Sequence, residues 1–198
     1  IKYFKADFLG NTISRKGGLY YEWGVRHYVL YEYEKHLADL NSRRRPLMKW
    51  TDFVKAAKGK LSIEHIYPQT PDNEYWVSRF SSFTEEERKN LQGSLGNLML
   101  LSQSINSSLQ NDSFPDKKAI KKDEEGNIIR QGYCNGSYSE QEVASCSEWT
   151  AEEIKARGLK MIEFLEKRWE MPIKTEKERL SLLFIPLPKE KADGDIEQ

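Results

Sequence analysis

Hydrophobic and polar positions along the chain follow helix-like and strand-like spacings in turn. From Leu19 to about Asn41, apolar and aromatic residues recur at intervals of three and four, as on one face of an amphipathic helix. The tyrosines of this face are suited to core packing or to stacking on bases, and a stripe at helical spacing is more often core. The spacing therefore predicts one long helix whose tyrosines pack inward.

The stretch LSIEHIYPQ, from Leu61 to Gln69, alternates apolar and polar residues like a half-buried strand. Pro68 cannot donate to a strand ladder, so the strand should end before it. Successive side chains of a strand point to opposite faces, and Glu64 and His65 should therefore leave the strand end on opposite sides.

A second strand is predicted for the apolar run GNLMLL, which begins at Gly96. Ser102 can cap a helix that follows it and carries Asn106. Between the two strands, residues 70–94 should form one or two short helices, because Thr84 and Glu87 have the spacing of a capping box. The predicted order is strand, long loop, strand, helix.

The C-terminal part contains one strong helix signal. Thr150 and Glu153 form a second capping-box pattern and open an amphipathic helix that Pro172 ends, whereas residues 126–147 resemble a loop or short hairpin. We expect an N-terminal helical segment (1–60) that packs on a core (61–172), followed by a partly disordered tail (173–198) whose apolar residues 180–187 pack as an arm. The predicted fold class is α+β and mostly helical.

Charge gives no overall preference for nucleic acid. The chain has 198 residues with 31 basic and 31 acidic side chains, so its formal net charge is zero and any DNA affinity must come from a local patch. Two clusters are candidates, and for each the alternative is a simple solvated loop. The residues that could contact phosphate are Arg43 and Arg44 in the first cluster and Lys117, Lys118 and Lys121 in the second.

Cysteine usage and hydropathy suggest the compartment. Cys134 and Cys146 form no CxxC pattern, which favours a reducing environment. The sequence shows neither an apolar run of membrane-spanning length nor a secretion signal, so we expect a cytoplasmic protein without membrane association. Because the chain begins at Ile1 and not at methionine, we also expect it to be a fragment that lacks upstream domains.

The pair Glu64 and His65 suggests hydrolytic chemistry. A histidine is suited to act as a general base near neutral pH, and a carboxylate or carboxamide oxygen is a hard ligand for magnesium or manganese. Phosphodiester hydrolysis uses both functions. Asn106 could supply a second oxygen ligand if its helix packs across the two strands. Taken alone, a single histidine on an apolar strand is more often structural than catalytic.

These motifs together resemble a known nuclease family. IEHIYPQ, GNLMLL and the nine-residue step from Asn97 to Asn106 resemble the HNH or His-Me finger motif. More narrowly, IEHIYPQTP, LGNLMLL, SINSSLQNDSF and WTAEEIKAR are similar to the C-terminal nuclease domain of GmrSD-type modification-dependent restriction enzymes. WGVRHYVLYEYE is similar to the helix that precedes the motif in that family.

The resemblance implies a role for each matching residue. It implies that His65 is the general base, that Glu64 and Asn106 bind the metal, and that Asn97 holds the loop carrying the base. Arg157 falls in a helix of the family and is a further DNA-binding candidate. Glu replaces the usual Asp and Asn the usual last His, so all metal ligands are oxygens, which favours Mg²⁺ or Mn²⁺ over zinc.

The resemblance also implies a ββα-metal core embedded among flanking helices and a DNA endonuclease of restriction or anti-phage defence. In that family the domain usually accompanies an upstream ParB-like nucleotide-hydrolysing domain, which is the partner expected besides DNA.

Two other classes stay open. The first is a catalytically silent nucleic-acid-binding or protein-interaction module of the same fold, which the intact Glu64, His65 and Asn106 argue against. The second is a structural metal domain, which lacks ligand pairs at usable spacing. Its possible ligands are His27, His36, His65, Cys134 and Cys146.

Overall fold

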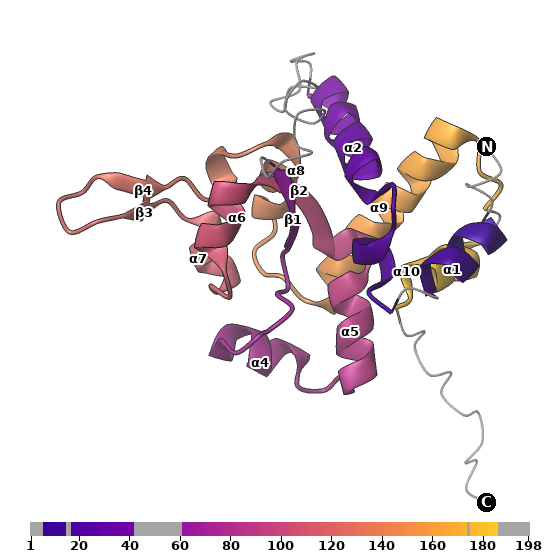
Figure 1. Ribbon diagram of the computed structural model, residues 1–198, viewed down its shortest axis with the longest axis horizontal. Helices are drawn as coiled ribbons and strands as arrows, with labels where there is room; N and C mark the ends of the chain where they lie inside the picture. Colours follow the sequence, from indigo (N-terminus) through magenta and orange to yellow (C-terminus); the bar gives the residue numbers. More distant parts are fainter. Residues whose placement is uncertain (1–5, 15–16, 42–60, 174, 186–198) are drawn as a thin grey trace, which may run out of the picture.

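The computed structural model describes residues 6–14, 17–41, 61–173 and 175–185. Within these ranges the fold is a mixture of α and β structure that is mostly helical, as predicted (Figure 1). The helices are α1 (Ala6–Ser14), α2 (Arg26–Leu40), α4 (Glu74–Phe80), α5 (Glu85–Gly93), α6 (Gln103–Leu109), α7 (Phe114–Lys118), α8 (Tyr138–Ala144), α9 (Ala151–Trp169) and α10 (Glu176–Leu183), with 3-10 turns η2 (Leu19–Glu22), η4 (Leu95–Asn97) and η5 (Tyr133–Asn135). The strands are β1 (Leu61–His65), β2 (Leu98–Ser102), β3 (Lys121–Lys122) and β4 (Ile128–Arg130).

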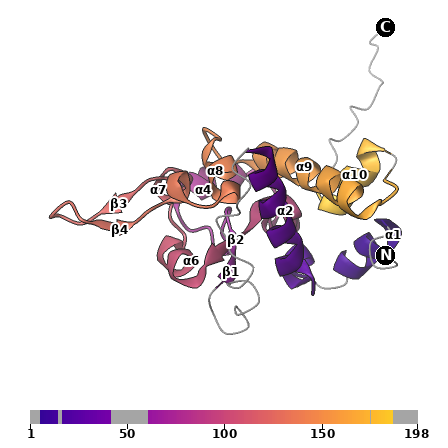
Figure 2. The ribbon, with the colours of Figure 1, turned by 90° about the horizontal axis from the view of Figure 1, so that it is seen from above.

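The strands β1 and β2 form an antiparallel pair at the centre of the described chain. Glu64 is opposite Met99 and His65 is opposite Leu98, so the two residues leave β1 on different faces of the sheet. The helix α6 lies on one side of this pair and α2 on the other (Figures 1 and 2). The predicted order of strand, long connection, strand and helix is therefore observed.

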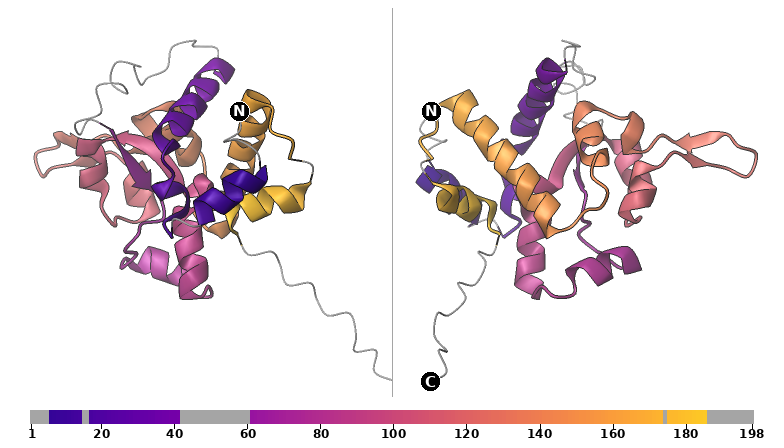
Figure 3. Two further views of the ribbon diagram at one scale, coloured as in Figure 1. Left: turned by 45° about the vertical axis from the view of Figure 1, so that its right-hand side comes forward. Right: turned by 180° about the vertical axis from the view of Figure 1, so that it is seen from behind.

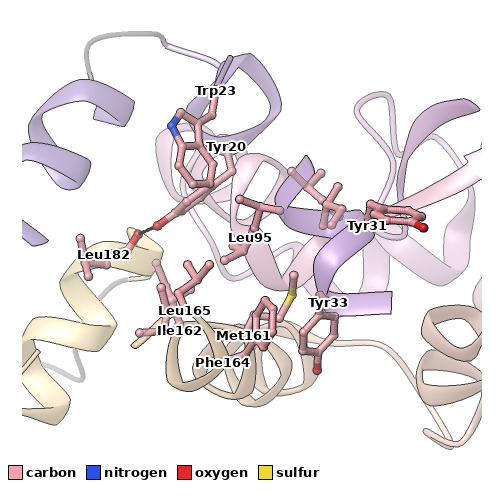
Figure 4. Close-up of a cluster of buried hydrophobic side chains, with 14 of the residues drawn as sticks. Tyr20, Trp23, Tyr31, Tyr33, Leu95, Met161, Ile162, Phe164, Leu165 and Leu182 are labelled. Atoms are coloured by element: carbon pink, nitrogen blue, oxygen red, sulfur yellow. Dashed lines mark hydrogen bonds between the residues drawn. The ribbon is translucent and has the colours of Figure 1, made fainter. Parts of the chain in front are cut away.

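The face of the sheet that carries Ile63 and His65 packs against the larger hydrophobic core. Leu98 and Leu100 join residues of α1, η2, α2, α9 and α10 in this cluster. The hydroxyl of Tyr20 donates to the backbone oxygen of Leu182 over 2.9 Å and so ties η2 to α10 (Figure 4). Figure 3 shows α1 beside α10, and α9 packs against η4 and α10.

The opposite face packs against a second cluster, rich in aromatic rings. Met99 and Leu101 of β2 contribute to it. Tyr67 and Phe80 stack with ring centroids 3.8 Å apart and planes 5° from parallel, which fixes α4 against the segment that follows β1. The two clusters together cover both faces of β1 and β2.

Several helix boundaries confirm the sequence prediction. The capping boxes at Thr84 and Thr150 are present, and the side chain of Ser102 caps α6. Tyr33 on α2 is buried in the core, as its helical spacing predicted.

The long helix predicted from Leu19 was wrong in one respect. Trp23 adopts an extended conformation after η2, so α2 begins only at Arg26. This break turns the start of α2 toward β1. The cluster that contains Arg43 and Arg44 lies outside the described residues.

Some elements of the C-terminal half differ from the prediction. Ser137 and Glu140 form a capping box that opens α8 inside the expected loop or hairpin region. A hairpin does form, but earlier, from β3 and β4, and it projects from the rest of the described chain (Figure 2). In the expected tail, α10 packs against α9 and α1, and Leu182 and Leu183 are buried.

None of the helices in the described ranges has the length and apolar character needed to cross a bilayer.

Candidate active site

A cavity of about 480 Å³ runs along the edge of β1 that does not pair with β2. The described residues that line it come from η2 and the start of α2, from β1 and the loop after it, and from α6 and the residues just beyond. They are Tyr21, Arg26, His27, Ser62, Ile63, Glu64, His65, Pro68, Gln69, Thr70, Gln103, Asn106, Gln110 and Asn111. Glu64 and His65 of the first motif thus share one cavity with Asn106, which lies more than 40 positions further along the chain.

His65 lies at the end of β1 and is 8 % exposed. Its ring packs against Tyr21, with centroids 4.6 Å apart, and no described residue forms a hydrogen bond with its ring nitrogens. Burial, and next the charge of Lys117, lower the pKa of His65 to about 4. The imidazole is therefore neutral near pH 7 and its ring has an unprotonated nitrogen.

Glu64 lies on the other face of β1 and is 3 % exposed. Its Oε1 atom accepts hydrogen bonds from Nζ of Lys117 at 2.6 Å and from the hydroxyl of Tyr133 at 2.8 Å. Burial raises the pKa of the Glu64 carboxyl, and the Lys117 ammonium opposes that rise. Both donors act on Oε1, and Oε2 is the oxygen that remains for another ligand.

Lys117 is fully buried at the end of the short helix α7. Besides Glu64, its ammonium donates to the backbone oxygens of His65 and Ile66, each at 3.2 Å. These three acceptors match the three N–H donors of a lysine. The position does not suit the predicted role in phosphate contact, because the ammonium is directed inward and its donors are used.

Asn106 projects from α6 toward β1. Its amide nitrogen donates to Oγ of Ser62 at 2.8 Å and to the backbone oxygen of Ile63 at 3.0 Å. A backbone oxygen is only an acceptor, which fixes the orientation of the amide and leaves Oδ1 as its free acceptor. Ser62 and Glu64 share a face of β1, so Asn106 is directed to the Glu64 side of the strand.

Asn97 is fully buried and binds the segment that follows β1. Its Oδ1 accepts from the backbone nitrogen of Tyr67 at 2.8 Å, and its Nδ2 donates to the backbone oxygens of Tyr67 at 2.9 Å and Gln92 at 3.0 Å. The indole nitrogen of Trp149 also donates to Oδ1 at 3.2 Å. Asn97 thereby holds the backbone two residues beyond His65.

The remaining DNA-binding candidates have different surroundings. Arg157 is buried, pairs with Glu142, and donates to the backbone oxygens of residues 96 and 98, so its position is also unsuited to phosphate contact. The ammonium of Lys118 donates to the backbone oxygen of Cys146 at 2.7 Å. Lys121 is exposed on β3 and stays a prediction.

The sequence analysis did not select two groups at this site. Tyr133 reaches Glu64 from η5, 69 positions along the chain, and no local pattern indicates that contact. Arg26 and His27 line the cavity from the start of α2. The sequence analysis named His27 only as a possible ligand of a structural metal domain and did not name Arg26. The sequence contains one indication of their exposure: both are polar, and neither belongs to the apolar face of the helix.

The described residues contain no group of three or more His, Cys, Asp or Glu side chains that could hold a metal ion. The five possible ligands of a structural metal domain all lie in the described part, so the geometry gives that interpretation no support. A site made from Glu64 and Asn106 would have one carboxylate and one carboxamide oxygen, which suit a hard cation that keeps several waters.

One of three comparisons with known proteins identifies a family. A family model described as the C-terminal domain of GmrSD restriction endonucleases matches residues 1–164. Searches of curated proteins and of solved structures gave no match.

Proposed function

The chain belongs to the family of C-terminal domains of GmrSD restriction endonucleases, and from this premise we propose that it is a metal-dependent DNA endonuclease of the HNH type. The observation that carries the proposal is the meeting of Glu64, His65 and Asn106 in one cavity at the edge of β1. The order of β1, β2 and α6 suits a ββα-metal core.

The proposed roles follow from the contacts of each residue. The neutral imidazole of His65 would accept a proton from the attacking water, because it reaches the cavity and has no hydrogen-bond partner among the described side chains. Asn97 would keep His65 in position through its bonds to Tyr67. Oxygens of Glu64 and Asn106 would hold Mg²⁺ or Mn²⁺, and such a cation stabilises the charge that develops on phosphate.

The biological role follows from the family. The domain name supports restriction, with DNA as the substrate, and we propose a function in defence against foreign DNA. A ParB-like nucleotide-hydrolysing domain or subunit is the partner we propose for the selection of that DNA.

One observation favours a second candidate, a catalytically silent nucleic-acid-binding module. The ammonium of Lys117 is 2.6 Å from Oε1 of Glu64, and a cation already next to the carboxylate weakens its attraction for a divalent metal. The two candidates differ in whether Oε2 still binds metal and whether DNA is cut.

Plasmid cleavage with Mg²⁺ or Mn²⁺ tests the proposal. We expect the chain to cut, and His65→Ala to lower the rate by about 10² to 10⁴ while its metal affinity stays unchanged, because the base is not a ligand. His36→Ala is the matched control, since His36, on α2, packs against Phe164 of α9 and does not line the cavity. Cleavage by His65→Ala at the rate of the control would contradict the mechanism.

A further inference from the structure

We propose that Arg26, at the start of α2, binds a phosphate of the nucleic-acid backbone in the active-site cavity. The identity of the ligand rests on the proposed function, whereas the site itself rests on the contacts of Arg26. The start of α2 would then be part of the active site in addition to being part of the scaffold.

The position of Arg26 supports this proposal. Arg26 and His27 line the same cavity as Glu64, His65 and Asn106. The guanidinium of Arg26 lies over the ring of Tyr21, 5.6 Å from its centroid, and the other neighbour of that ring is His65 at 4.6 Å. Tyr21 therefore neighbours both a cation and the proposed general base.

The hydrogen bonding of Arg26 leaves donors for a ligand. Its Nη1 donates to the backbone oxygen of Trp23 at 3.0 Å. Its Nε is buried and has no partner among the described residues, and no carboxylate of those residues forms a salt bridge with it. A buried donor without a partner is costly, and a phosphate oxygen would satisfy it with a charge-assisted bond.

The end of the helix that bears Arg26 also favours an anion. Val25 is the N-cap of α2 and supplies no side-chain acceptor, and the first turn contains no acidic residue. The macrodipole of a helix attracts negative charge near its N-terminus. The first amide of α2, that of Arg26, already donates to the backbone oxygen of Trp23 at 3.0 Å, so the dipole and the later amides of the first turn remain to act on an anion. The fifteen-residue helix α2 thus presents its positive end at the cavity wall.

Lys117 and Arg157, the other buried candidates for phosphate contact, differ from Arg26 in having a carboxylate partner. Lys117 and Arg157 are buried and bonded to Glu64 and Glu142 respectively. Among the cavity-lining residues that the structure describes, Arg26 is the one lysine or arginine. It is therefore the cationic side chain placed to meet phosphate there.

The test measures DNA binding and not cleavage. A short fluorescent duplex is titrated with the protein in EDTA over a series of salt concentrations, for the wild type, Arg26→Gln and Arg26→Lys. Glutamine keeps a donor for the Trp23 oxygen but removes the charge, and lysine keeps the charge. Lys89→Gln is the matched control, because it removes one positive charge from exposed α5. Thermal melting checks that each variant folds.

We expect Arg26→Gln to bind about tenfold more weakly and the slope of log K against log salt to fall by about 0.9, as for one lost phosphate contact. Arg26→Lys should keep most of the slope, and Lys89→Gln should match the wild type. If Arg26→Gln binds like Lys89→Gln, or if Arg26→Lys loses the slope as fully as Arg26→Gln, the phosphate site is wrong.

Failure of this proposal is separable from failure of the proposed function. A wild type that cuts DNA with metal but shows no Arg26 dependence in EDTA removes the phosphate site alone. A wild type that never cuts but binds DNA with the Arg26-dependent slope removes the endonuclease assignment and supports the phosphate site. If one of the two Arg26 variants does not fold, the slope of log K against log salt for the other is compared with that for Lys89→Gln.

Discussion

The two faces of β1 hold neighbouring residues in different ways. On one face, Glu64 is fixed by an ion pair with Lys117 and a hydrogen bond from Tyr133. On the other face, His65 is held by packing against Tyr21, without a hydrogen bond to its ring from the described residues. Both side chains are nearly buried, so burial alone does not distinguish them.

The difference matches what each proposed role requires. A metal ligand needs a fixed oxygen, and buried donors limit the orientations of the carboxylate. A general base needs an accessible ring nitrogen, and packing orients the ring without occupying that nitrogen. Each prediction below changes the support on one face and measures whether the other face is affected.

The largest effect is expected for Lys117→Met. The substitution leaves the Glu64 carboxylate buried without its cation, and breaking a buried pair on one side costs about 3–5 kcal/mol. Urea unfolding measures the loss. In the Lys117→Met, Glu64→Gln double variant no charge is left unpaired, and we expect part of the stability to return.

Lys118→Met is the control for this prediction. Lys118 is the next residue, but its ammonium is only partly buried and donates to a backbone oxygen, so the expected cost is below about 1 kcal/mol. A Lys117→Met protein as stable as this control would mean that the ion pair contributes little to the fold.

The second-largest effect is expected for the affinity of the protein for Mn²⁺. If Glu64 and Asn106 are ligands, Glu64→Gln and Asn106→Ala should each weaken Mn²⁺ binding by at least about tenfold. Glutamine at position 64 keeps an acceptor for Lys117 but leaves its buried ammonium without a counter-charge, so urea unfolding first checks that this variant is folded under the conditions of the titration. Calorimetric titration measures the affinity, and Ser107→Ala, an exposed neighbour on α6, is the control.

Asn97→Ala separates orientation from ligation. Asn97 forms hydrogen bonds with the backbone of Tyr67 and does not line the cavity. Asn97→Ala should therefore lower the cleavage rate at saturating Mn²⁺ but leave the affinity for Mn²⁺ unchanged. Unchanged Mn²⁺ affinity in both Glu64→Gln and Asn106→Ala would show that the metal binds elsewhere.

The sequence predicted this region because its signals are local. The alternation before Pro68 predicts β1, and Ser102 as a possible cap after the apolar run predicts a helix after β2. The opposite directions of Glu64 and His65 follow from the two-residue repeat of a strand. The roles assigned to these residues came from the family resemblance and stay predictions.

Local sequence patterns do not predict contacts between segments that are far apart in the chain. Lys117 was interpreted as a surface cation because it stands in a basic cluster, but α7 turns it into the core, where Glu64 is 53 positions away in sequence. Arg157, a candidate from the family resemblance and not from a charge cluster, is also buried, against the backbone of β2. Charge clustering predicts exposure only when no buried carboxylate or carbonyl group lies within reach.

A smaller effect is expected for Tyr133→Phe. The change removes one hydrogen bond to Oε1 of Glu64 but leaves the Lys117 pair in place, so stability should fall by about 1–2 kcal/mol. Mn²⁺ affinity should weaken by a few fold, because the carboxylate gains freedom. Tyr138→Phe, on the adjacent helix α8, is the control for loss of a hydroxyl. An affinity change equal to that of Glu64→Gln would mean that Tyr133 and not Lys117 dominates the orientation of Glu64.

The smallest effect concerns the other face of β1, where Tyr21 packs on His65. Tyr21→Leu removes an aromatic contact worth about 0.5–1.5 kcal/mol, so the cleavage rate should fall by at most about tenfold. Because Tyr21 also lies beneath Arg26, DNA affinity is measured in parallel to separate binding from orientation of the base. Tyr21→Phe keeps the ring and should restore the rate, whereas Mn²⁺ affinity should stay unchanged in both variants, since Glu64 is held from the opposite face. If Tyr21→Leu weakens Mn²⁺ binding as much as it lowers the rate, the two faces do not act separately, and packing around His65 also positions the metal ligands.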